Sequence, residues 1–197
     1  MERKISNLTP EELGRLFPIE VLPYNCDWII HFEKEKNNLT EILGDSVALR
    51  IEHFGSTSVP GIASKPTIDI LVEIPPLTDE LKEWIINKMQ DTGYDFIWRS
   101  DHKIPYMMFV KGYHITGIKE QTFHIHMGEH NHSLWDRLYF RDYLRQNTET
   151  LKEYEKLKLE LAEKYRYDRE GFTNAKTDFI TSITILAKTL ANNHKKQ

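Results

Sequence analysis

The chain has 197 residues, of which 40% are hydrophobic and 28% are charged. This length and composition predict one globular domain with a substantial core, and they exclude a disordered chain. The 26 basic residues are outnumbered by 30 acidic residues, so the formal net charge is −4. Proteins that bind duplex nucleic acid normally carry a basic excess, and we therefore expect none as a partner. Small phosphorylated partners need only a local basic patch.

The cysteine content and the absence of long apolar runs indicate where the protein resides. Cys26 is the only cysteine, which excludes an internal disulfide and favours a reducing compartment. The first ten residues lack the apolar core of a signal peptide, and no window is apolar over the length of a membrane span. We therefore expect a cytoplasmic protein with no membrane partner, and its oligomeric state stays open.

Residues 1–26 are predicted to be an N-terminal extension that packs on a single domain of residues 27–197. Within this extension, Thr9 is a suitable N-cap, Pro10 occupies the first helical position, and two acidic residues follow. This pattern predicts a short helix that ends before Pro18.

The rest of the chain alternates between helical and strand patterns. Helical spacing and capping signals predict helices over residues 28–43, 78–91, 133–146, 149–165 and 173–192. Clusters of aromatic and branched residues predict strands over residues 47–54, 67–74, 94–98, 106–111 and 122–127. The apolar stripe predicted for the last helix consists of Phe172, Ala175, Phe179, Ile183, Leu186 and Leu190. These elements predict an α+β fold: a mixed five-stranded sheet with helices on one side and a C-terminal helical part.

The segment of residues 54–72 is the most informative about chemistry. It reads as the end of a strand, a polar turn with Gly55, Ser56 and Thr57, and the first part of a second strand, residues 67–72, in which Asp69 is the one carboxylate. A carboxylate in a buried strand costs several kcal/mol unless a cation or hydrogen-bond donors satisfy it. The turn offers backbone N–H groups and hydroxyls that suit a phosphate. Together these features predict nucleotide chemistry.

Two neighbouring runs carry a family signature, IEHFGSTSVPG at residues 51–61 and KPTIDI at residues 65–70. They resemble the signature of the GrpB family, bacterial proteins grouped with the nucleotidyltransferase superfamily. The resemblance continues at residues 107–113, 124–126, 135, 140–144 and 176, and so covers most of the chain. It implies a polymerase-β-like nucleotidyltransferase fold. In some actinobacteria a similar domain is fused to dephospho-CoA kinase, which hints at nucleotide metabolism.

The resemblance also implies roles for individual residues. In the superfamily, a Gly-Ser pair holds nucleotide phosphates, and two carboxylates one residue apart on the next strand hold divalent metal. Gly55 and Ser56 match the pair, and Asp69 matches the first carboxylate, which makes it the candidate catalytic and metal-binding residue. The second carboxylate position is occupied by Leu71. A one-metal site remains open, since magnesium needs only one or two protein carboxylates plus substrate phosphates.

A second set of candidate metal ligands lies on the strand predicted over residues 122–127. His124 and His126 alternate there, so both imidazoles point the same way. If this strand is the superfamily's third-carboxylate strand, one histidine could approach Asp69. An Asp/His/His set favours Mn²⁺, Zn²⁺, Ni²⁺ or Fe²⁺ over Mg²⁺. The alternative is a pair of half-exposed strand histidines without a ligand.

Basic residues supply further candidates for phosphate binding. Lys65 could neutralise a phosphate, or it could be a solvated loop lysine. Arg137, Arg141 and Arg145 recur every four residues on one predicted helix and could face an anionic substrate. Arg141 is preferred because it lies in the family-like run FRDYL, whereas Arg145 is expected on a solvated face.

The preferred interpretation is a nucleotidyltransferase-like protein that binds a nucleoside triphosphate or another small phosphorylated molecule, with metal-dependent nucleotidyl transfer as its candidate activity. Gly55, Ser56 and Thr57 would hold the phosphates, and Asp69 would hold Mg²⁺ or Mn²⁺. One alternative, motivated by Leu71, is a catalytically degenerate nucleotide-binding module. Another is a metal-binding protein or metallohydrolase that uses the two strand histidines, in which case Zn²⁺ or Ni²⁺ is expected.

Overall fold

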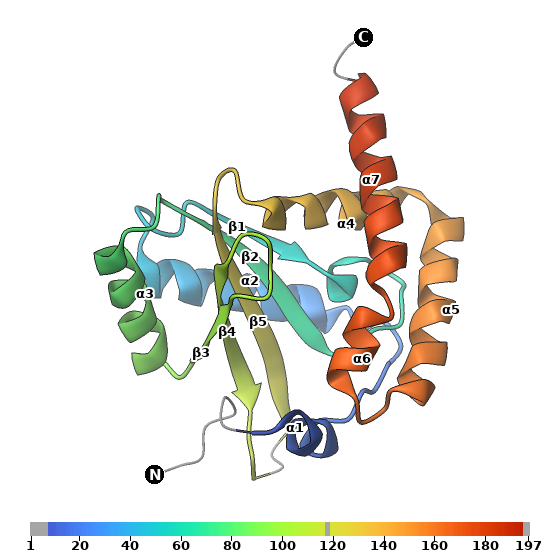
Figure 1. The fold of residues 1–197 in the computed structure, drawn as a ribbon, viewed down its shortest axis with the longest axis horizontal. Coiled ribbons are helices and arrows are strands. Elements are labelled where there is room, and N and C mark those ends of the chain that lie inside the picture. Colours follow the sequence, from blue (N-terminus) through green and yellow to red (C-terminus); the bar gives the residue numbers. More distant parts are fainter. Residues whose placement is uncertain (1–7, 117–118, 195–197) are drawn as a thin grey trace. The chain divides into compact units, whose positions relative to one another are not determined.

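The computed structural model describes residues 8–116 and 119–194 (Figure 1). The chain divides into two compact units that interleave in sequence. The first unit contains Cys26–Phe54 and Thr67–Trp135, and the second contains Leu8–Asn25, Gly55–Pro66 and the chain from Asp136 onward. The extension of residues 1–26 and the single domain of residues 27–197 stay predictions. No helix among the described residues has the length and apolarity needed to cross a membrane.

The first unit is built on the predicted mixed sheet of five strands. These are β1 (Arg50–Phe54), β2 (Thr67–Ile74), β3 (Asp95–Arg99), β4 (Tyr106–Tyr113) and β5 (Lys119–Glu129), in the spatial order β1-β2-β5-β4-β3. The β2 and β5 strands pair in parallel, and every other neighbouring pair is antiparallel. The predicted fold class is therefore confirmed.

Two helices, α2 (Asp27–Leu43) and α3 (Asp79–Asp91), cover one face of this sheet (Figure 1). Phe32 of α2 stacks on His53 of β1 with 4.7 Å between the ring centroids. The side chains on this face are mostly apolar and fully buried, as their branched and aromatic composition predicts. Because strand residues alternate between faces, Phe54 and its partner Asp69 point to the opposite face.

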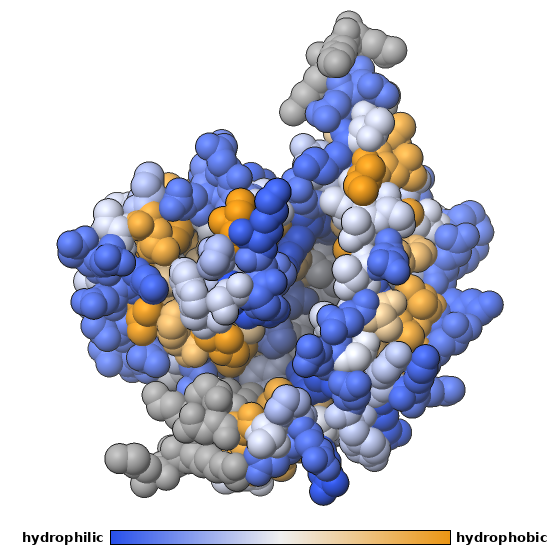
Figure 2. All heavy atoms as spheres, viewed as in Figure 1, coloured by the Kyte–Doolittle hydropathy of each residue, from blue (hydrophilic) through white to orange (hydrophobic). Residues whose placement is uncertain are grey.

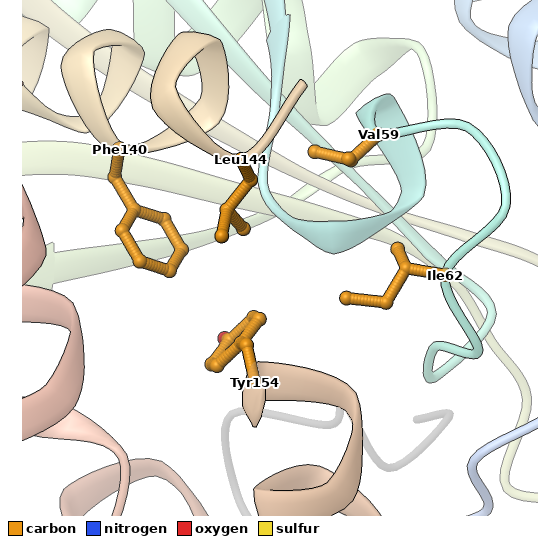
Figure 3. Close-up of a cluster of buried hydrophobic side chains, with 5 residues drawn as sticks. All are labelled: Val59, Ile62, Phe140, Leu144 and Tyr154. Carbon is orange, nitrogen blue, oxygen red and sulfur yellow. The ribbon is translucent and has the colours of Figure 1, made fainter. Parts of the chain in front are cut away.

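The second unit is helical. Its elements are α1 (Pro10–Leu16), η2 (Ser56–Ser58), α4 (Asp136–Gln146), α5 (Thr148–Lys164), α6 (Arg169–Asn174) and α7 (Thr177–His194). Figure 3 shows its buried cluster, in which side chains from the 55–66 loop, α4 and α5 point toward one another. The cluster consists of Val59, Ile62, Phe140, Leu144 and Tyr154. It explains why the loop between β1 and β2 belongs to this unit.

The single C-terminal helix predicted over residues 173–192 is wrong in one respect, since the chain forms α6 and then α7. Because α6 ends at Asn174 and α7 begins at Thr177, the predicted apolar residues do not follow one continuous helical face. Phe172 and Phe179 still pack inward, but Leu186 and Leu190 are 41% and 42% exposed. Orange patches on α7 in Figure 2 show apolar side chains that remain at the surface.

The first helix begins at the predicted N-cap. The Thr9 hydroxyl accepts from the Glu12 N–H, and the Glu12 carboxylate accepts from the Thr9 N–H, forming a capping box. We expect Thr9→Ala to lower the free energy of unfolding by about 1 kcal/mol. The substitution removes the acceptor of the Glu12 N–H group and weakens the reciprocal bond from the Thr9 N–H group to the Glu12 carboxylate. Urea unfolding followed by circular dichroism measures this. Thr189→Ala, at an exposed position within α7, is the control and should change stability by less than about 0.5 kcal/mol. Equal effects of the two substitutions would contradict the capping role.

Candidate metal centre

The parallel pairing of β2 with β5 places the sequence-predicted metal ligands together. Asp69 lies opposite His124 in the register, and Leu71 lies opposite His126. All four side chains belong to the sheet face that is opposite α2. The sheet therefore joins two segments that are more than fifty residues apart in the sequence.

The three candidate ligands form a compact cluster. The His124 Nδ1 atom lies 3.5 Å from an Asp69 carboxylate oxygen. One ligand atom from each of Asp69, His124 and His126 lies within 4.8 Å of the other two. Asp69 and His124 are half-buried, and His126 is buried. A carboxylate and two imidazoles at this separation fit a divalent transition metal, with positions left open for water or a substrate.

Each histidine ring is held by a tyrosine that the sequence analysis did not single out. The Tyr113 hydroxyl lies 2.6 Å from His124 Nε2, and the buried Tyr106 hydroxyl lies 3.1 Å from His126 Nδ1. Phe54 also packs its ring edge-to-face with His126, at 5.3 Å between centroids. These contacts are made by His124 Nε2 and His126 Nδ1, so the two rings are held through different nitrogens. Partners of this kind orient ligating histidines in known metal sites.

Among residues 8–116 and 119–194, no second carboxylate, which a two-metal site would need, belongs to the cluster. Leu71 is 1% exposed and occupies that position on the strand. The Glu73 carboxylate, two residues further on, pairs with His130 Nδ1 at 3.0 Å. The arrangement therefore suits a single ion with imidazole-rich coordination.

The predicted phosphate-binding turn belongs to the second unit. Gly55 has a φ of 71°, in the left-handed region that favours glycine, and η2 follows it. The Ser58 hydroxyl donates to the Gly55 carbonyl at 2.6 Å. Thr57 is 1% exposed, and Ser56 is half-buried. The roles of these residues in phosphate binding stay predictions.

Arg145 is exposed, as predicted, and it also contacts the polar turn. Its Nε and Nη2 atoms donate to the Ser58 carbonyl at 3.2 and 2.7 Å, so it anchors the polar turn to α4. The sequence contained no signal for this contact, because the two residues are 87 positions apart.

The other basic candidates are less exposed. Arg141 is mostly buried and donates to the neighbouring Asp142 carboxylate at 2.7 Å, and Lys65 is half-buried. Their phosphate-binding roles also stay predictions.

Two charged residues of α5 hold the other end of the same loop. The Glu155 carboxylate accepts from the Ala63 N–H at 2.5 Å. The buried Lys158 ammonium donates to the Ala63 carbonyl and to the Ser64 hydroxyl, the latter at 3.2 Å. Burial, reinforced by the nearby charge of Lys176, lowers the pKa of Lys158 to about 7. Sequence analysis did not single out either α5 residue.

Comparison with known proteins agrees with the sequence signature. Residues 18–185 match the model of the family described as GrpB protein. The chain belongs to the GrpB family. It is 37% identical over 166 residues to the glutamate-rich protein GrpB of Alkalihalophilus pseudofirmus, covering 83% of this chain and 92% of that one.

Solved structures extend this comparison to the fold. The chain resembles the crystal structure of the conserved protein GrpB from Enterococcus faecalis, with a TM-score of 0.73 and 29% identity over 85% of this chain and 96% of the other. A weaker likeness in fold, with a TM-score of 0.41 and 13% identity, links it to the Cid1 poly(U) polymerase over 73% of this chain and 46% of that one.

Proposed function

We propose that this GrpB protein is a metal-dependent enzyme that acts on a nucleotide or another small phosphorylated molecule. The observation that carries the proposal is the cluster of one carboxylate and two tyrosine-held imidazoles, whose ligand atoms lie within 4.8 Å of one another. Asp69, His124 and His126 would hold one divalent ion. Such an ion would polarise a phosphoryl oxygen or activate a water.

The composition of the cluster supports a specific choice of metal. Imidazole ligands suit Mn²⁺, Fe²⁺, Ni²⁺ and Zn²⁺, whereas Mg²⁺ prefers oxygen ligands. The buried Leu71 side chain argues against a second ion beside the first. The proposal is therefore a one-metal site, and Zn²⁺ or Mn²⁺ should bind more tightly than Mg²⁺.

The phosphate side of the proposal rests on the family-like turn and the basic residues of the second unit. Gly55, Ser56 and Thr57, together with Lys65 and Arg141, are its candidate phosphate-binding residues. Nucleotidyl transfer is the reaction that the superfamily resemblance favours.

Thermal denaturation of the purified chain tests the proposal. The chain is measured with Zn²⁺, Mn²⁺, Ni²⁺ or Mg²⁺, each with and without nucleoside triphosphates. A metal present at a hundred times its dissociation constant should stabilise the folded state by ~2.7 kcal/mol. We expect this stabilisation in the wild type, its loss in Asp69→Asn and in His126→Ala, and a further nucleotide shift only when metal is present. Glu73→Gln is the matched control, because its carboxylate lies on the same strand and pairs with His130 instead. A wild-type protein that no metal stabilises would refute the proposal.

Leu71 favours a second candidate function, a nucleotide-binding module that has lost catalysis. In this case triphosphates would stabilise the protein without being turned over, and binding would survive in Asp69→Asn. The same denaturation series separates the candidates. A nucleotide shift that is independent of both metal and Asp69 would select the module, whereas a metal shift without any nucleotide effect would select a metalloprotein or metallohydrolase that uses the two histidines.

A further inference from the structure

A β-bulge near the end of β4 changes the face to which Tyr113 points. The β4–β5 register is regular from Met107 to Lys111 and shifts between Lys111 and Tyr113. Lys111 points to the helix-covered face, where its ammonium contacts Glu35 of α2. Strict alternation would put Tyr113 on that same face. Between the register pairs of Lys111 and Tyr113, β4 has one residue, Gly112, whereas β5 has three, and beyond this shift Tyr113 lies on the opposite face, where its hydroxyl contacts His124.

Gly112 is a position that only glycine suits. Its φ is +82°, and a Cβ atom there would lie 2.1 Å from the Gln121 carbonyl oxygen. Backbone of this kind is costly for any other residue. Bulges that re-aim a side chain are over-represented beside functional sites. The side chain that this bulge redirects is the phenol of Tyr113.

The redirected phenol meets the ring of His124. The Tyr113 hydroxyl lies 2.6 Å from His124 Nε2, and the two rings stack with 5.8 Å between centroids and 20° between planes. The other ring nitrogen, Nδ1, consequently faces the Asp69 carboxylate at 3.5 Å. One hydrogen bond thus determines which nitrogen of His124 is presented to the cluster.

We infer that Tyr113, placed by the Gly112 bulge, is a positioning residue that fixes the ring orientation and tautomer of His124 for metal binding. The inference rests on the proposed function in assigning a metal to this site. With a metal on Nδ1, the Nε2–H group donates to the phenol oxygen, which keeps the ring from rotating and satisfies the remaining donor. Tyr106 holds His126 through the opposite nitrogen, Nδ1.

Tyr113→Phe tests this inference, because phenylalanine keeps the stacked ring and removes only the hydroxyl. Calorimetric titration of the metal-free chain with Zn²⁺ should show an affinity 10- to 100-fold below that of the wild type. Long-range ¹H–¹⁵N NMR of the histidine rings should show one tautomer of His124 in the metal-free wild type and a mixture in the variant. Tyr139→Phe, on α4, is the matched control and should change neither result.

The two readouts separate the possible failures. If the wild type binds Zn²⁺ and Tyr113→Phe binds it with the same affinity, the inference is overturned and the proposed function stands. A fall in affinity with an unchanged tautomer would assign the effect to packing and overturn positioning. A wild-type chain that does not bind Zn²⁺ would overturn the proposed function, and the tautomer measurement would then decide alone whether Tyr113 fixes the His124 ring.

Discussion

Lys111→Met is expected to lower the free energy of unfolding by about 3 kcal/mol, because it leaves a buried carboxylate without its cation. The Lys111 ammonium lies 3.1 Å from both carboxylate oxygens of Glu35, which is 3% exposed. The Tyr94 hydroxyl donates to the same carboxylate at 2.5 Å. Burial, together with this hydrogen bond, raises the pKa of the Tyr94 phenol well above its ordinary range. The phenol therefore stays neutral, and the lysine is the group that balances the charge.

Urea unfolding of the wild type and the variant measures this loss. Arg50→Met is the matched control, since its ion pair with Glu52 is partly exposed and should contribute less than about 1 kcal/mol. In a Glu35→Gln background the Lys111→Met substitution should cost less than half as much, because no buried charge remains to be balanced. An equal cost in both backgrounds would show that the loss comes from packing of the lysine stem.

The free energy of unfolding should rise between pH 7 and pH 10 through the titration of Lys158. The pKa of Lys158 is about 7 in the folded protein, below the ordinary lysine value of 10.5. Between these values the unfolded chain binds more protons than the folded chain, so stability increases with pH. Each pKa unit corresponds to 1.36 kcal/mol, and the rise attributable to Lys158 is about 4 kcal/mol. The physical cause is the burial of the ammonium, which is relieved when the proton leaves.

Urea unfolding at pH 7, 8, 9 and 10 tests this prediction by difference. Lys158→Met should show a flatter pH dependence than the wild type, while other titrating groups contribute equally to both curves. Lys152→Met, at an exposed position on the same helix, is the control and should follow the wild-type curve. Parallel curves for the wild type and Lys158→Met would contradict the low pKa. Lys158→Met also removes the donor to the Ala63 carbonyl, which lowers stability at neutral pH. The informative quantity is therefore the slope of the free energy of unfolding against pH, and not its value at one pH.

The sequence alone predicted the elements whose signals are local. The β2 bounds, residues 67–74, agree with the structure, and α1 begins at its predicted N-cap. These predictions succeed because turn residues, capping side chains and apolar periodicity act within a few positions of one another. The start of β1 was predicted three residues too early, since Val47 lies in a turn and the strand begins only at Arg50.

The candidate site shows where this local information ends. Asp69 and the His124/His126 pair could each be identified as chemically unusual from their own surroundings. Their meeting depends on the parallel pairing of β2 and β5, which is a long-range register that no local pattern encodes.

Tertiary structure also decided what holds the candidate residues. The Gly112 bulge reverses the face on which Tyr113 lies, and simple alternation along the strand would have predicted the opposite. The contact from Arg145 to Ser58 and the burial of Lys158 arise from packing between distant segments. The sequence by itself therefore determined the GrpB family, most of the secondary-structure elements and the candidate site residues. Their partners, tautomers and ionisation depend on distances and burial that only the folded chain defines.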